Sequence, residues 1–286
     1  MTTLVLWVVL LAAFMHAFWN SLISRASDKS LFTMALHVCS ALLAVPLLCI
    51  VGLPSADSYP YLVSSILLHG LYIYILTKVY TRSAFGPAYI VMRGVAPLFV
   101  MLISLLALGE SFAIRDFVGL MSISLGILFL LRTYLIPQAT LSTALSGSHL
   151  EFALLNALVI AAYTVVDGIG ARLSGNPLAY VLVSAFFEPI LVYVLAYRRQ
   201  TGALWRFSKN NAALIVLGSS ISIAGYSMVL WAMTVSPIAL VSALRETSVV
   251  FAMLISIFWF KEGRFAPAAV SSLLMLCGIY FLKASA

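Results

Sequence analysis

Hydrophobic residues follow one another in ten long runs along this 286-residue chain, separated by short breaks that carry Gly, Pro, Ser and charged residues. A run of roughly 20 apolar residues is enough to cross about 30 Å of hydrocarbon as a helix. The runs are continuous rather than alternating, which favours helices over a β-barrel. We expect spans at residues 4–24, 31–53, 59–80, 86–109, 115–131, 150–171, 178–197, 210–233, 237–260 and 265–282. The pattern predicts an all-α integral membrane protein.

Composition supports this fold class and excludes a soluble protein. Hydrophobic residues make up 63% of the chain, charged residues 9%, and the mean hydropathy is +1.11. So few charges could not cover the surface of a water-soluble domain. The first run has no basic region and no small-residue cleavage site, so we interpret it as a retained span. The three cysteines form no CxxC pair and no metal-ligand spacing, so we expect no metal and no cofactor.

The two halves of the chain resemble each other at a fixed spacing. An offset of 152 aligns Tyr74 with Tyr226, Arg93 with Arg245, Met101 with Met253, Ser104 with Ser256, Glu110 with Glu262, Gly126 with Gly278 and Phe129 with Phe281. Near the start of each half an offset of 147 aligns His16 with Tyr163, Asn20 with Asp167, Arg25 with Arg172 and Ser27 with Ser174. Matched charged residues go beyond what chance similarity between hydrophobic segments explains. The sequence indicates a first repeat at 1–132, a linker at 133–149 and a second repeat at 150–286.

Each repeat holds five spans, an odd number, so the second copy must enter the membrane from the opposite side. Such an inverted-topology repeat is typical of secondary transporters, whose substrate site lies near the bilayer midplane where the halves meet. We therefore expect two inverted five-helix repeats around a central site.

Basic residues are distributed unequally between the two sides of the membrane. One side carries Arg25, Lys29, Lys78, Arg82, Arg132, Arg198, Arg199, Arg206, Lys209, Lys261 and Arg264. The side of the termini carries Arg115, Arg172 and Lys283. By the positive-inside rule the termini would face away from the cytoplasm. Membrane topology accounts for the net charge of +7, and we expect no nucleic-acid partner.

An arginine and a glutamate, Arg245 and Glu246, lie side by side in the ninth span, about 12 Å from its start along a helix. Charges at this depth cost several kcal/mol, about 2.5–3.5 on insertion scales, unless they face a partner or a wet cavity. Since consecutive residues are rotated by about 100° on a helix, we expect the two side chains to have different partners. Arg93 holds the matching place in the fourth span, four residues before a helix-kinking Pro97. Its neighbour is Gly94, so Glu246 breaks the internal symmetry.

Further intramembrane polar residues are candidates for the same cavity. His16, Trp19 and Asn20 share a helix face in the first span, and Tyr163 and Asp167 take the matching places in the sixth. Glu188 precedes Pro189 at an expected kink in the seventh. The alternative for each is a structural role, because polar side chains also join helices within membranes. The predicted substrate-binding residues are His16, Trp19, Asn20, Arg93, Tyr163, Asp167, Glu188, Arg245 and Glu246.

The chain resembles the drug/metabolite transporter superfamily, in particular its ten-helix EamA-type branch. The resemblance rests on "HAFWN" in the first span, "RGVAPLFVML" followed by "LGE" in the fourth, and "ALRETSVVFAML" followed by "FKE" in the ninth. It implies a multi-pass carrier of the bacterial inner membrane that works by alternating access without ATP and often moves amino acids. It also implies that His16, Trp19, Asn20, Arg93, Arg245 and Glu246 lie near the cavity. Well-known members have cytoplasmic termini, opposite to the basic-residue bias, so both orientations stay open.

The sequence therefore predicts a secondary transporter of a small polar, zwitterionic metabolite, with protons as a candidate coupling ion. Arg93 or Arg245 would attract an anionic group, and Glu246 or Asp167 an ammonium group or a proton. A carrier of anionic metabolites and a non-transporting accessory subunit are the alternatives. Known hydrolase, metalloprotease and nucleotide-binding motifs do not occur, so an enzyme is not expected. The oligomeric state stays open.

Overall fold

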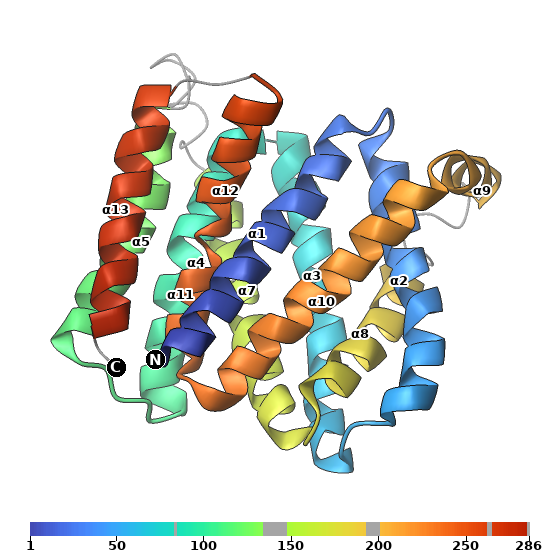
Figure 1. The fold of residues 1–286 in the computed structure, drawn as a ribbon, viewed down its shortest axis with the longest axis horizontal. Coiled ribbons are helices and arrows are strands. Elements are labelled where there is room, and N and C mark those ends of the chain that lie inside the picture. The colour runs from blue at the N-terminus through green and yellow to red at the C-terminus, as the bar shows by residue number, and fades with distance from the viewer. Residues whose placement is uncertain (83–84, 134–147, 193–200, 262–264, 285–286) are drawn as a thin grey trace.

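The protein is a single bundle of helices that run roughly along one direction, as the computed structural model shows (Figure 1). The structure describes residues 1–82, 85–133, 148–192, 201–261 and 265–284. The first half contributes α1 (Thr3–Arg25), α2 (Lys29–Val51), α3 (Tyr59–Arg82), α4 (Phe85–Ala107) and α5 (Ile114–Thr133). The second contributes α7 (Ser148–Leu173), α8 (Pro177–Val192), α9 (Thr201–Asn210), α10 (Ala212–Val235), α11 (Ile238–Arg245), α12 (Ser248–Leu254) and α13 (Phe265–Ala284).

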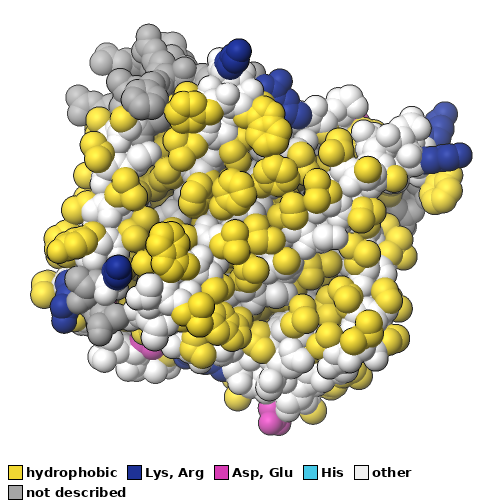
Figure 2. Space-filling view, viewed as in Figure 1, with side chains coloured by type: hydrophobic (Ala, Val, Ile, Leu, Met, Phe, Trp, Pro, Cys, Tyr) yellow, Lys and Arg dark blue, Asp and Glu magenta, His cyan; other side chains and the backbone are white. Residues whose placement is uncertain are grey.

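Each of the ten predicted spans corresponds to a helix or helical run. Among the described residues, seven helical stretches are long and apolar enough to cross a membrane, and Pro177–Leu191 and Ala269–Lys283 are shorter apolar helices. Both chain termini lie at the same edge of the bundle, as an even number of crossings requires (Figure 1). Hydrophobic side chains cover the middle of the face shown in Figure 2, and charged side chains lie at its margins. This is the surface expected of a multi-pass membrane protein.

Side-chain caps set where several helices begin. Asp28 Oδ1 accepts from Leu31 N at 2.9 Å at the start of α2. Asn176 Oδ1 accepts from Leu178 N at 3.1 Å at the start of α8. Such caps satisfy backbone N–H groups that a helix leaves unpaired in its first turn. Asp28 and Asn176 end the short turns between the first two helices of each half, so the two halves begin in a similar way.

The packing of α5 on α13 has the self-complementary form of a two-fold axis. A Cβ added to Gly278 would lie 2.6 Å from Gly119 O, so the two backbones nearly touch there. Seven residues further along α5, Gly126 O accepts a hydrogen bond from Ser271 Oγ of α13 at 2.6 Å. At the offset of 152, Gly119 corresponds to Ser271 and Gly126 to Gly278. The contact between Gly119 and Gly278 is therefore the symmetry mate of the contact between Ser271 and Gly126. An antiparallel pair of equivalent helices is what an inverted repeat requires.

The two halves are interleaved rather than placed side by side. α3 packs on α7, and its counterpart α10 packs on α1. α4 packs on α7, and its counterparts α11 and α12 pack on α1. Since α1 corresponds to α7, these pairs are related by the same two-fold pseudo-symmetry. The charged residues of α4 and α11 thereby come to the centre of the bundle.

Two features differ from the sequence-based expectations. The polar break between the seventh and eighth spans contains a further helix, α9, which lies across the ends of its neighbours (Figure 1). The ninth span is not one regular helix but α11, α12 and a π-helical segment at Ile255–Trp259. A hydropathy pattern shows neither feature. The break that contains α9 is polar whether or not it is helical, and the ninth span is apolar whether or not its helix is regular.

Candidate functional site

A buried ion pair joins the two halves of the protein. Arg93 Nη1 of α4 lies 3.0 Å from Glu246 Oε1 and 3.1 Å from Glu246 Oε2. The Glu246 side chain is 1% exposed and that of Arg93 is 13% exposed. A charge-assisted contact to both carboxylate oxygens is the strong form of such a bond, and burial removes the competing water.

Arg245 is the second arginine of this cluster. Its Nη2 lies 3.4 Å from Glu246 Oε1, a longer contact than that of Arg93. The expectation that Arg245 and Glu246 have different partners is therefore only partly right, because Glu246 serves both arginines. In the part of the chain that the structure describes, Arg245 Nε is buried and has no hydrogen-bond partner. We call Arg93, Arg245, Glu246 and His16 the central charge cluster.

The backbone changes from an α-helix to a 3₁₀ turn at Glu246, the residue after the end of α11. Glu246 N donates to Ala243 O and Thr247 N to Leu244 O, both at 3.1 Å, in the i to i−3 pattern of a 3₁₀ turn. Thr247 Oγ1 also donates to Leu244 O at 2.7 Å, so a side chain reinforces the turn. This turn is wound more tightly than an α-helix, and Glu246 is the residue that follows the end of α11 there. A 3₁₀ stretch inside a helix often marks a functional hinge.

His16 of α1 completes the cluster from the other side of Arg93. Its Nε2 lies 2.8 Å from Arg93 Nη2. Arginine carries donors only, so His16 Nε2 must accept this bond and be unprotonated. The Trp19 ring meets the His16 ring edge to face at 5.3 Å. Asn20 Nδ2 donates back to His16 O at 2.7 Å, so its amide is held by its own helix.

Asp167 of α7 forms a second buried polar group, which we call the Asp167 cluster. The carboxylate is 1% exposed. Tyr180 Oη donates to its Oδ1 at 3.1 Å, and Tyr226 Oη donates to its Oδ2. Ser65 and His69 of α3 also interact with Asp167. Side chains from three other helices, drawn from both halves, thus surround this carboxylate of α7.

Tyr163 of α7 is buried and interacts electrostatically with members of both clusters: Arg93, Arg245 and Glu246 in the first and Asp167 in the second. Its ring stacks on that of His69, with centroids 4.1 Å apart. Tyr163 and His16 are counterparts at the offset of 147, and both interact with Arg93, His16 by a hydrogen bond and Tyr163 electrostatically. The two clusters are therefore electrostatically linked through Tyr163.

The structure brings together most of the residues singled out from the sequence. His16, Arg93, Arg245 and Glu246 form one cluster, and Trp19 and Asn20 flank His16. Tyr163 and Asp167 continue the polar region. No contact within the described ranges joins Glu188 to these residues, and the structure gives it no hydrogen bond or ion pair there. Glu188 is half-buried in α8 and stays a prediction.

Four members of the site, Ser65, His69, Tyr180 and Tyr226, are not among the substrate-binding residues predicted from the sequence. Tyr180 lies near the start of α8 and His69 inside α3. A buried tyrosine usually finds a hydrogen-bond partner, and histidine is rare in lipid-exposed helices, so polarity within a span was the available signal. Sequence spacing could not show which helices would pack together. Among the described residues, no group of three or more His, Cys, Asp and Glu side chains is arranged to hold a metal ion.

Glu110 has a separate structural role. Its Oε1 accepts from Ile238 N at 3.2 Å and from Arg172 Nη2 at 3.0 Å. Arg172 also donates through Nε to Met233 O at 2.8 Å. The carboxylate therefore caps the first turn of α11 and ties it to α7. The capped helix belongs to the other half of the chain, and the counterpart of Glu110, Glu262, lies outside the described residues.

Comparisons with known proteins agree with this architecture. Residues 149–283 match the model of the EamA-like transporter family. A solved crystal structure of a protein superposes with a TM-score of 0.71, covering 99% of this chain and 96% of the other, at 17% sequence identity. At that identity the likeness shows the fold alone. No curated protein matches the chain.

Proposed function

We propose that this EamA-type member of the drug/metabolite transporter superfamily is a secondary active transporter of a small, polar, zwitterionic metabolite such as an amino acid. The family is one of transporters rather than enzymes, and the apolar helices make the chain a multi-pass membrane protein. The substrate, the coupling ion and placement in a bacterial inner membrane are parts of the proposal. The buried central charge cluster between the two halves is the observation that carries it.

Charge balance in this cluster favours an anionic group on the substrate. Two guanidinium groups share one carboxylate, and Arg245 Nε is buried without a partner among the described atoms. An unpaired buried donor on a charged group is costly, about 1–3 kcal/mol or more. A substrate carboxylate would satisfy this donor and compensate the second positive charge. Arg245 is therefore the proposed carboxylate-binding residue.

A second, cationic group on the substrate would be met by the acidic residues. When a substrate carboxylate binds the arginines, it competes with Glu246 for Arg93. The displaced Glu246 carboxylate would then be available to a substrate ammonium group. Asp167 is the other acidic group, and its tyrosine partners can donate to it whether or not it carries a proton. We propose Asp167 as the proton-binding group, since intramembrane carboxylates commonly serve as proton relays.

The position of the ion pair supports alternating access as the proposed mechanism. Glu246 is 1% exposed, so the cluster is closed in this conformation and has to open for the substrate to reach it. Arg93 and Arg245 are counterparts in the repeat, and Glu246 contacts both. Movement of the Glu246 carboxylate from Arg93 to Arg245 would accompany the opening of the site to one side of the membrane and its closing to the other. The overwound turn at Glu246 and Thr247 is the proposed hinge.

A carrier of purely anionic metabolites is the second candidate. The excess of arginine over carboxylate in the central charge cluster favours it, and it would leave Glu246 with a gating role only. A non-transporting accessory subunit would use the same residues to hold helices together. The proposed function and these two alternatives predict different patterns of uptake in a proteoliposome flux assay.

Flux into proteoliposomes is the experiment that tests the proposal. The purified protein would be offered amino acids, carboxylic acids without an amine, and amines without a carboxylate, each with and without an imposed proton gradient. We expect uptake of amino acids, stimulated by the gradient and lost in Arg245→Gln. The control variant is Glu151→Gln, which changes an exposed carboxylate in the first turn of α7. Uptake of carboxylic acids alone would support the second candidate, and no uptake of any class would refute transport of such metabolites.

A further inference from the structure

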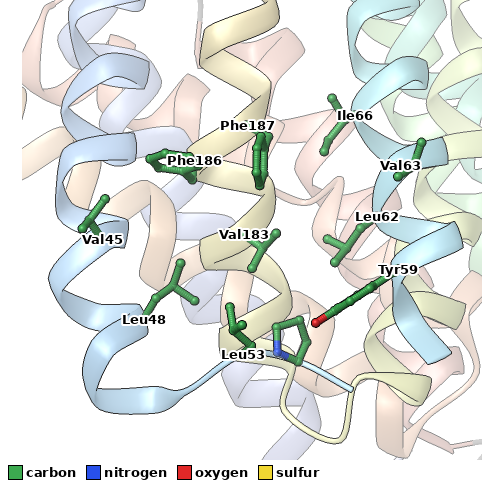
Figure 3. A pocket seen from close by; sticks show the side chains of 11 residues that line it. Val45, Leu48, Leu53, Tyr59, Leu62, Val63, Ile66, Val183, Phe186 and Phe187 are labelled. Atoms are coloured by element: carbon green, nitrogen blue, oxygen red, sulfur yellow. The ribbon is translucent and has the colours of Figure 1, made fainter. Parts of the chain in front are cut away.

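An apolar crevice lies between α2, α3 and α8, away from the central charge cluster (Figure 3). Its volume is about 550 Å³, within the range of roughly 300–1,000 Å³ of pockets that bind small molecules. Val183 of α8 lies at its base, with Leu62 and Ile66 of α3 on one wall and Leu48 of α2 on the other. The α2–α3 turn closes one end through Leu53 and Pro54.

The crevice opens to the outer surface of the bundle. Val63 and Phe187, at its mouth, are 59% and 50% exposed. The walls of the crevice belong to α2 and α3, which are candidate membrane spans, so a bilayer would lie against its mouth. Apart from the Tyr59 hydroxyl, the lining side chains offer water no hydrogen-bond partner, so water is an unfavourable occupant of most of the crevice. The crevice therefore requires an apolar one.

The repeat shows what fills the equivalent place in the second half. At the offsets of 152 and 147, Val63 corresponds to Ile215 and Val183 to Leu36. Both counterparts are buried, at 3% and 1% exposure. They belong to one hydrophobic cluster with Leu204 of α9, which inserts beside them. In the second half, a side chain of the protein itself, Leu204, thus packs at the place that corresponds to the crevice.

Among the described residues of the first half, no segment corresponds to α9. Its corresponding connection runs from Gly52 to Ser58 and contains only the short 3₁₀ helix Ala56–Ser58. The connection in the second half is longer and holds α9, whose Phe207 ring also meets the Phe32 ring edge to face at 6.3 Å. One crevice is therefore closed by the chain, whereas the equivalent crevice is left open to the bilayer.

We propose that the open crevice binds an acyl chain of a bilayer phospholipid, which takes the place that Leu204 of α9 takes in the other repeat. The proposal goes beyond the transport function and does not depend on it. The phospholipid is favoured over other apolar ligands because the mouth opens sideways into the acyl-chain region. The lipid would support the packing of α2 and α3 against α8 as α9 supports α2 and α10.

Photo-crosslinking in lipid nanodiscs tests this site on the parent protein. The probe is a phosphatidylglycerol with a diazirine at the end of one acyl chain, and labelled peptides are identified by mass spectrometry. We expect labelling concentrated on the peptides that carry Leu62 to Ile66 and Val183 to Phe187. Equal labelling of all lipid-facing helices, including α4 at the exposed Leu106, would overturn the proposal.

Filling the crevice provides the matched comparison. Ile66→Trp and Val183→Trp place bulk inside the crevice, and Leu106→Trp places the same bulk on an exposed part of α4. We expect labelling of the crevice peptides to fall several-fold in each filled variant and to stay at the parent level in Leu106→Trp. Unchanged labelling in both filled variants would contradict the site.

A second arm distinguishes the source of the acyl chain. A free fatty acid is added in two ways: without a probe, in excess over the diazirine phospholipid, and with the same diazirine, in nanodiscs that contain unlabelled phospholipid. If the phospholipid is the occupant, excess fatty acid leaves the phospholipid labelling intact. If the crevice peptides react only with the fatty acid, the proposal of a phospholipid is wrong. The parent-protein measurement decides the question even if a filled variant does not fold.

Discussion

Arg93 donates to both carboxylate oxygens of Glu246, at 3.0 and 3.1 Å, across 153 residues of sequence. Arg245, the counterpart of Arg93 in the repeat, contacts the same carboxylate at 3.4 Å. A single acidic residue therefore lies between two arginines that are equivalent by pseudo-symmetry. This arrangement makes Glu246 the most informative position to change.

Glu246→Gln should abolish gradient-driven uptake and lower the thermal stability of the protein. The amide keeps the shape of the side chain but leaves two buried arginines without a negative charge. Removing one partner of a buried ion pair costs about 3–5 kcal/mol in soluble proteins, so a clear fall in melting temperature is expected. Flux into proteoliposomes and thermal unfolding in detergent measure the two effects.

A double variant separates function from stability at this pair. Arg93→Gln combined with Glu246→Gln removes both charges, so stability should recover toward that of the parent protein. Uptake should stay lost, because the charges that recognise the substrate are gone. Parent-like uptake in the single variant Glu246→Gln would reject a role for this residue in transport.

Asp167→Asn should leave exchange of substrate across the membrane intact but abolish accumulation of substrate driven by a proton gradient. The amide can still accept from Tyr180 or Tyr226, but it cannot bind and release a proton. If Asp167 is the coupling group, the variant exchanges internal for external substrate at a rate near that of the parent. It does not accumulate substrate in response to a proton gradient. Gradient-driven accumulation at the parent level in this variant would show that the coupling proton binds elsewhere.

Gly278→Val should destabilise the protein through the α5–α13 contact. A Cβ at this position would lie 2.6 Å from both Gly119 O and an Ile123 side-chain carbon, so the helices must separate. Overpacking of this kind typically costs about 1–3 kcal/mol. The control is Gly202→Ala in α9, where an added Cβ meets nothing within 4 Å. Equal melting temperatures for the two variants would contradict the close approach of α5 and α13.

Glu110→Ala should loosen the start of α11. The variant loses the acceptor of Ile238 N and the partner of Arg172, and loss of a cap of this kind costs about 1 kcal/mol. Hydrogen exchange should therefore increase in the first turn of α11. Glu151→Ala, at an exposed position, is the control and should leave α11 unchanged. Unaltered exchange at Ile238 in Glu110→Ala would show that the cap is dispensable.

Sequence reasoning singled out the charges of the candidate site because burial of polar groups in lipid is costly. Arg93, Arg245 and Glu246 stood out as charges within apolar runs, and each is found in the central charge cluster. Tyr180 and His69 did not stand out, because tyrosine and histidine also occur as packing residues. Their role depends on α8 and α3 lying against α7, and one helix's sequence does not carry that information.

The sequence by itself determined the membrane class, the number of spans and the inverted repeat. These follow from local hydropathy and from matched residues at a fixed offset, so no long-range contact is needed to see them. Only the tertiary structure decided that Glu246 pairs with Arg93, that the ninth span is overwound at this residue, and that α9 closes one crevice while the other stays open. Each of these depends on how helices far apart in the chain approach one another. That approach is set by side-chain packing over the whole bundle, where a shift of one residue would exchange a buried partner for lipid.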